Sequence, residues 1–248
     1  MDGKAKYGAT GDFIFREAVK FLRGKKALPK EAYELLDEES RMKAFTVSGY
    51  TSLEVLNTFL ETLAKAVEEG ETKENFQNTM NHFLEDKGYI GINPWKADVV
   101  FRTNVQTAYN AGHYRSMTNE TTKKLRPFWQ YRTAADGHVR EEHAVMHGRV
   151  YRCDDKIWDV WYPPNGFRCR CGVVSLSERQ LKEKGLKVET KPPIQVDYST
   201  GEIRTLFPDK GFSNNPAKGA WKPDLSGLSP ELKKIYKEQA VKRPISEK

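Results

Sequence analysis

The chain has 248 residues, enough for one or two domains, and 30% of them are charged while only 38% are hydrophobic. We find no apolar run of the ~18–20 residues that cross a bilayer and no charged-then-apolar N-terminal signal, which excludes membrane-spanning and signal-directed classes. The sequence therefore predicts a cytosolic protein with reduced thiols and no membrane contact. The formal net charge is +7, and the basic excess lies at residues 101–171 and 208–248. Such an excess favours DNA or an acidic protein surface as a partner.

Residues 1–92 are predicted to form a helical arm. Apolar residues recur there at helical spacing, which is typical of the interior faces of a helical bundle. The clearest helix begins after Ser52 and ends at Gly70, and another begins after Thr72 and ends at Gly88. The stripe of the first comprises Leu53, Leu56, Phe59, Leu60, Leu63 and Val67, and that of the second comprises Phe76, Met80, Phe83 and Leu84.

Residues 93–207 are predicted to form a domain made of a long helix and a small sheet. The helix begins at Asn93-Pro94 and continues to about Met117. Arg102 and Asn104 interrupt its apolar stripe, and we interpret them as anchors for a loop or a partner. The alternative is that the long helix simply packs on the domain that follows it.

The pattern changes after Arg126-Pro127, where FWQYRTA alternates and is rich in aromatic residues, as expected of a strand. RVYR and GVVSL are predicted as two further short strands. Residues 208–248 are rich in Gly, Pro and Lys and are expected to form an extended, poorly packed basic tail with a short terminal helix. The predicted fold class is therefore α+β: a helical N-terminal half, a small mixed or antiparallel sheet domain and an extended tail.

Residues 136–171 concentrate the side chains that carry chemistry, with three of the five His and all three Cys. Zinc is bound by thiolates and neutral imidazoles in a tetrahedron, so Cys169, Cys171 and Cys153 are candidate sulfur ligands and His143 or His147 the nitrogen ligand. The turn Pro163-Pro164-Asn165-Gly166 bends the chain before the Cys-x-Cys pair. The alternative is a compact core, with the thiols on a strand edge and His143 hydrogen-bonded to a carbonyl or to Asp136.

A catalytic centre is the third interpretation of this segment. Asp136, His143 and His147 resemble the residue types of metal-dependent nucleases, in which His activates water and a carboxylate orients it. However, the sequence contains neither a complete H-N-H pattern nor H-E-x-x-H, so we favour a non-enzymatic protein. The aromatic residues, Trp158 among them, could stack on nucleic-acid bases, but the core of a small sheet domain is the better interpretation.

Several stretches resemble the phage Mu F-like head-morphogenesis, or minor capsid, protein family. They are FRTNVQTAYNAGHY at 101–114, RPFWQYRTAADGHVREEHAVMHGRVY at 126–151, WDVWYPPNGFRCRC at 158–171, and the SLSERQL that follows. The resemblance implies a structural protein of a tailed-phage head, located in the virion near the portal and assembled in the bacterial cytoplasm. It further implies roles in head assembly and in DNA packaging or retention, with the portal protein, the major capsid protein and phage DNA as partners.

The resemblance also selects among the candidate site residues. Arg102, Asp136, Arg140, His143, Gly148, Cys169 and Cys171 occupy characteristic positions of the family pattern, whereas Cys153 does not. His143 with Cys169 and Cys171, joined by His147, is therefore the preferred metal-ligand set, and zinc is the only cofactor indicated. Arg102, Asn104, Asp136, Arg140, Trp158, Pro163 and Pro164 are the expected structural or interaction residues.

Overall fold

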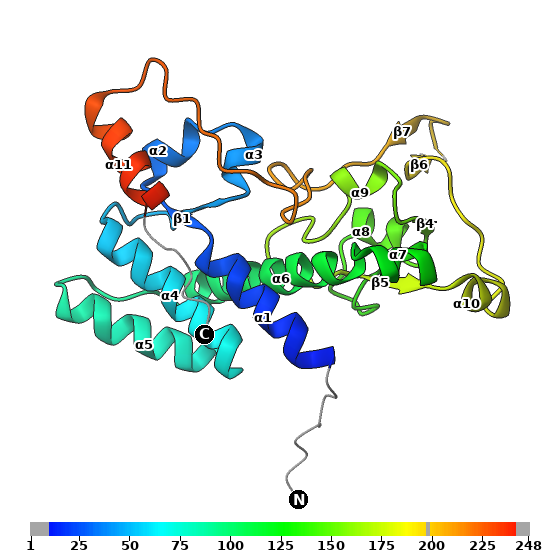
Figure 1. Ribbon diagram of the computed structural model, residues 1–248, viewed down its shortest axis with the longest axis horizontal. Helices are drawn as coiled ribbons and strands as arrows, with labels where there is room; N and C mark the ends of the chain where they lie inside the picture. Colours follow the sequence, from blue (N-terminus) through cyan, green and yellow to red (C-terminus); the bar gives the residue numbers. More distant parts are fainter. Residues whose placement is uncertain (1–9, 197–198, 242–248) are drawn as a thin grey trace, which may run out of the picture. The chain divides into compact units, whose positions relative to one another are not determined.

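The computed structural model describes residues 10–196 and 199–241 (Figure 1). Contacts divide the chain into two compact units, one formed by residues 1–113 with 216–248 and the other by residues 114–215. The predicted segments were 1–92, 93–207 and 208–248. The boundaries of the observed units differ from the predicted ones for two reasons. The long helix α6 (Pro94–Met117) contributes residues to both units, and most of the tail belongs to the helical unit.

The first unit is helical and has an aliphatic core. Its principal helices are α1 (Thr10–Arg23), α4 (Leu53–Glu69), α5 (Lys73–Asp86) and most of α6. Ser52 caps α4 by accepting a hydrogen bond from the Val55 N–H, and Gly70 ends the helix in the left-handed region at φ 70°. Thr72 caps α5 in the same way. The predicted stripe residues of α4 are buried except Leu53, and those of α5 are buried except the partly buried Phe83, so the predicted helical bundle is confirmed.

Short elements complete this unit. Strands β1 (Lys26–Ala27) and β2 (Ala44–Phe45) pair in parallel, and helices α2 (Lys30–Glu34) and α3 (Glu38–Arg41) lie between them in sequence. The tail ends in α11 (Pro230–Val241), the short terminal helix that the sequence predicted. None of the helices in the described part of the chain has the length and apolar character needed to cross a bilayer.

The tail is attached to the helical unit at intervals, although many of its side chains are exposed. The Tyr236 hydroxyl donates to the carbonyl of Ala32, and the Lys222 N–H donates to the Ser40 hydroxyl at 3.4 Å. Gly219 lies so close to Met42 and to the Glu39 carbonyl that a Cβ there would clash with both. The tail is therefore extended and largely exposed, as predicted, and it is attached through single residues that form no periodic apolar pattern.

The second unit is built on a three-stranded antiparallel sheet with the order β4-β3-β5. Its strands are β3 (Phe128–Arg132), β4 (Val150–Arg152) and β5 (Gly172–Leu176), at the three stretches predicted from the sequence. Trp129 pairs with Tyr151 across β3 and β4, and Tyr131 pairs with Val173 across β3 and β5. The remaining elements are α7 (Glu120–Leu125), α8 (Glu141–Met146), α9 (Ile157–Val160), α10 (Glu178–Glu183) and the antiparallel pair β6 (Ile194–Val196) and β7 (Ile203–Thr205).

Aromatic side chains form the core of this unit. The fully buried members are Trp129, Tyr131, Tyr151, Trp158, Trp161 and Tyr162. The rings pack at tilted or edge-to-face angles, as in Trp129 on Trp158 with centroids 5.6 Å apart. Because these rings are covered by one another, they are not available to stack on nucleic-acid bases. The predicted α+β fold is confirmed.

Candidate functional site

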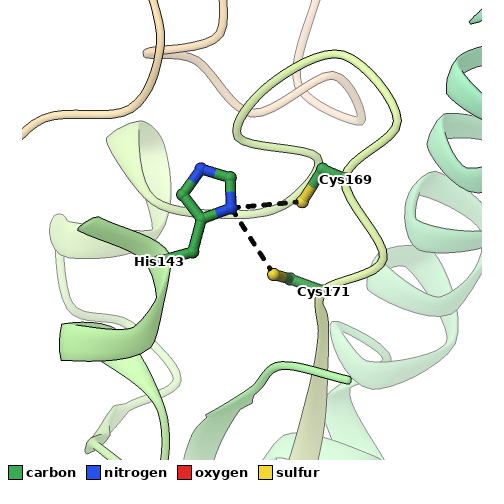
Figure 2. A group of neighbouring side chains, drawn as sticks. All are labelled: His143, Cys169 and Cys171. Atoms are coloured by element: carbon green, nitrogen blue, oxygen red, sulfur yellow. Dashed lines mark hydrogen bonds between the residues drawn. The ribbon is translucent and has the colours of Figure 1, made fainter. Parts of the chain in front are cut away.

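Three of the predicted ligands converge inside the second unit (Figure 2). His143 lies on α8, Cys169 on the loop that follows α9, and Cys171 immediately before β5. Pairing of β5 with the central strand β3 fixes the position of Cys171. Arg168 adopts a left-handed conformation, with φ 58°, which turns the chain sharply just before Cys169.

The imidazole of His143 faces both sulfurs. Its Nδ1 lies 3.8 Å from the Sγ of Cys169 and 3.8 Å from the Sγ of Cys171. Figure 2 shows the dashed lines that join this nitrogen to both sulfurs. One donor atom from each of the three residues lies within 4.8 Å of the other two. The exposed fractions of the three residues are 2%, 5% and 3% in the order His143, Cys169 and Cys171. The cluster is therefore buried, not placed in an open cleft.

The loop that precedes the cysteines sets the tautomer of His143. The Nε2 of His143 lies 3.2 Å from the carbonyl oxygen of Asn165. A carbonyl can only accept, so Nε2 carries the proton in this bond, and the neutral ring then presents the lone pair of Nδ1 to the sulfurs. A backbone carbonyl was one of the partners predicted for His143, and the carbonyl of Asn165 is that partner.

The two thiols affect each other's titration. A hydrogen bond from the Cys171 side chain lowers the pKa of Cys169, and the backbone N–H groups of Asn165 and Cys171 act in the same direction. The same side-chain bond, together with burial, raises the pKa of Cys171. The arrangement therefore favours one thiolate on Cys169 beside a protonated Cys171.

Asn165 holds the Pro-Pro-Asn-Gly turn in place and is itself fully buried. Its side-chain oxygen accepts from the Tyr131 hydroxyl at 2.6 Å, and its backbone carbonyl also accepts from the Asp209 N–H at 3.0 Å. Gly166 permits the approach of this segment, because a Cβ there would clash with Asp209 and with Arg140 Nη1. Pro163 and Pro164, both predicted structural residues, are buried in the same turn, and the peptide bond between them is cis.

The other predicted site residues lie around this cluster without joining it. Asp136 forms a two-pronged ion pair with Arg170, at 2.6 and 2.7 Å, and this pair lowers the pKa of Asp136 to about 2. Arg140 donates to the carbonyl of Phe167 at 2.8 Å and lies 3.7 Å from the Asp209 carboxylate. Both contacts support the loop that carries the cysteines.

His147 is not part of the cluster. Its Nδ1 lies 2.7 Å from the Thr133 hydroxyl and accepts from the Thr133 N–H at 3.2 Å. His147 is the C-cap of α8, where the backbone leaves the helical conformation, so its side chain does not continue the face of the helix that carries His143. Cys153, left outside the preferred ligand set, is half-buried elsewhere in the unit.

Trp158, Arg102 and Asn104 make contacts that are structural in kind. The Trp158 Nε1–H donates to the Arg152 carbonyl at 2.8 Å. On α6, Arg102 pairs with Asp98 at 2.6 Å and the Asn104 amide donates to the Val100 carbonyl at 2.9 Å, so both contacts remain within the helix. A role of Arg102 and Asn104 in binding a partner stays a prediction.

Sequence reasoning missed three participants: Asn165, Tyr131 and Arg170. A signal for Arg170 was present, because an arginine between two buried cysteines must point away from them and toward an anion. Asn165 and Tyr131 gave no comparable signal, since their roles depend on contacts between residues far apart in the chain.

Chemically, the cluster offers two sulfurs and one imidazole nitrogen to a single small ligand. Asp136, His143 and His147, the proposed nuclease set, each have different partners.

Comparison with known proteins identifies the family to which this sequence belongs. Residues 57–174 match the family model described as Phage Mu protein F like protein, and this range contains all three residues of the cluster. The chain belongs to the phage Mu F-like family. The predicted resemblance is thereby confirmed, and the family match includes the stretches 101–114, 126–151 and 158–171 that carried it.

Two curated relatives of the Mu F-like family show how far the similarity extends. A protein of Escherichia phage Mu, named provisionally as capsid assembly protein F, is 35% identical over 246 residues, covering 84% of this chain and 55% of the relative. The Mu-like prophage FluMu F protein of Haemophilus influenzae is 32% identical over 194 residues, covering 70% of this chain and 46% of the relative. The chain thus spans about half the length of these relatives. No solved structure matches it.

Proposed function

We propose that the chain is a structural component of a tailed-phage head and acts in head morphogenesis. The observation that carries this proposal is its membership of the Mu F-like family, together with a relative named for capsid assembly that aligns with 84% of the chain. The buried state of the His143 cluster supports a structural role, because enzymes that act on large substrates need their reacting groups to be reachable.

The proposed place of action is the portal vertex of the head, with the portal protein and the major capsid protein as partners. Two compact units in one chain suit a protein that contacts two different partners. In the helical unit, Ile90 is fully exposed and Trp95 is 68% exposed, although both are apolar. Exposed apolar side chains close together in sequence are a feature of protein contact surfaces, so this segment is the proposed docking point.

A role in packaging or retaining phage DNA is the finer part of the proposal. It is supported by the net charge of +7 and by the location of the basic excess in the second half of the chain. Contacts between Lys or Arg and phosphates release counterions, so binding of this kind weakens steeply as salt is raised. We therefore expect DNA affinity to fall strongly between low and physiological salt, and affinity that is insensitive to salt would argue against phosphate contact.

Co-purification with the head proteins encoded in the same genome tests the main proposal. The full chain is expected to capture the portal protein or the major capsid protein. The variant carrying Ile90→Ser and Trp95→Ala should capture less, while Leu125→Ser, which changes an equally exposed apolar residue of the other unit, should not affect capture. No capture of either protein, together with cleavage of plasmid DNA in Mg²⁺, Mn²⁺ or Zn²⁺ that His143→Ala abolishes, would instead establish a metal-dependent nuclease.

A further inference from the structure

The cluster of His143, Cys169 and Cys171 has a geometry that the head-assembly proposal does not use. We propose that these three side chains bind one zinc ion, and that the ion ties α8 to the Pro-Pro-Asn-Gly turn and to β5. This proposal stands on the arrangement of the donor atoms and is independent of the proposed function.

The distances between the donor atoms fit a tetrahedral ion. Zinc bonds of about 2.3 Å to sulfur and 2.0–2.1 Å to nitrogen, at tetrahedral angles, place sulfur and nitrogen ligands about 3.5 Å apart. The observed distances from His143 Nδ1 to the two sulfurs are both 3.8 Å. The three donor atoms all lie within 4.8 Å of one another, so a single ion between them can contact all three after small changes of the side-chain torsion angles.

The surroundings prepare His143 as a ligand. A zinc-bound histidine nearly always donates its second ring N–H to an oxygen, which fixes the ring and directs the free nitrogen to the metal. His143 shows this pattern, because Nε2 faces the Asn165 carbonyl while Nδ1 faces the sulfurs.

The donor set and its burial select the kind of ion. Sulfur and imidazole ligands suit zinc, whereas magnesium and calcium take oxygen ligands, and none of the three residues is a carboxylate. Both sulfurs bind as thiolates, with the proton of Cys171 released to solvent, so the doubly positive ion and two negative sulfurs form a neutral group. A neutral group can be buried at far lower cost than an isolated charge, in keeping with exposed fractions of 2–5%.

The fourth position of the tetrahedron is assigned to a water molecule. Within the described residues the cluster provides three His, Cys, Asp or Glu donors, and zinc takes four ligands.

Metal analysis of the intact protein, expressed without a histidine tag and purified under reducing conditions, is the direct test. We expect about one zinc ion per chain. Cys169→Ser, Cys171→Ser and His143→Ala should each lose most of this zinc. Cys153→Ser and His147→Ala provide matched controls, because they remove the same residue types from outside the cluster, and both should retain it.

Two measurements on the unaltered chain keep the test valid if the ligand variants do not fold. Cobalt added to the metal-free protein should produce sulfur-to-cobalt charge-transfer absorption, and zinc should protect Cys169 and Cys171 from alkylation while leaving Cys153 reactive. The proposal is overturned if the native protein binds neither zinc nor cobalt with its thiols reduced. It is also overturned if another metal occupies the site as purified, or if all three cysteines are alkylated equally with and without zinc.

Discussion

The two units of this chain are stabilised by different kinds of interaction. In the helical unit, long helices satisfy their own backbone hydrogen bonds, side-chain caps end them, and aliphatic stripes supply the core. In the sheet unit the strands have only three to five residues, and the loops depend on specific side-chain-to-backbone bonds such as that of Trp158 with Arg152. A small sheet with long loops therefore needs added cross-links, and the aromatic core and the His143 cluster lie where these are needed.

The largest expected effect is a loss of stability in one unit that leaves the other unit unchanged. Trp158→Ala should lower the free energy of unfolding of the sheet unit by about 3–5 kcal/mol, because it opens a cavity among packed rings and leaves the Arg152 carbonyl without its donor. Phe59→Ala should have a comparable effect on the helical unit. Hydrogen exchange, measured separately for β3 and for α4, shows which unit loses protection. Equal losses in both units for either variant would mean that the two unfold as one.

Removal of the proposed zinc ion should affect only the sheet unit. If free zinc exceeds its dissociation constant about a hundredfold, binding stabilises the folded unit by about 2.7 kcal/mol. A chelator should therefore lower the melting temperature of the sheet unit and leave exchange protection in α4 unchanged. Calorimetry with and without chelator provides the measurement, and Cys171→Ser protein, already lacking a ligand, should show little further change. An equal shift in both variants would indicate that the chelator acts elsewhere.

A smaller effect is expected where the tail joins the helical unit. Tyr236→Phe removes the hydroxyl that donates to the Ala32 carbonyl and should cost about 1 kcal/mol. Urea unfolding of the full chain measures this difference. Lys237→Ala, at the exposed neighbouring position, serves as the control and should leave the midpoint unchanged. A Tyr236→Phe variant as stable as the parent would mean that the tail contributes no stability through this bond.

The smallest effect concerns the surface ion pair beside the cysteine loop. Arg170 lowers the pKa of Asp136 from 3.8 to about 2, so the pair contributes stability above about pH 4, and this contribution is lost as the pH falls toward 2. Asp136→Asn should therefore be less stable than the parent at pH 5, and the difference should vanish near pH 2. Urea midpoints across this range test the direction. A difference that persists at pH 2 would assign the effect to something other than ionisation.

The features that the sequence allowed us to predict are those marked by a periodic pattern of apolar residues or by a short sequence motif. Apolar spacing in 53–67 predicted α4, alternation in 128–132 predicted β3, and the Cys-x-Cys motif with His143 predicted the cluster. The placement of His147 could not be predicted in this way, because the turn after α8 depends on tertiary packing. The attachment of the tail at Gly219 and Tyr236 was missed for a similar reason, since single close contacts leave no repeating pattern.

The carbonyl of Asn165 accepts hydrogen bonds from His143 and from Asp209, which lie on opposite sides of it in sequence. During synthesis, His143 and both cysteines leave the ribosome before Asp209 does. His143, Cys169 and Cys171 are therefore all present in the nascent chain before Asp209 can donate to the carbonyl of Asn165. The order of translation thus brings the three donor residues out of the ribosome before the residue that closes the outer side of the turn.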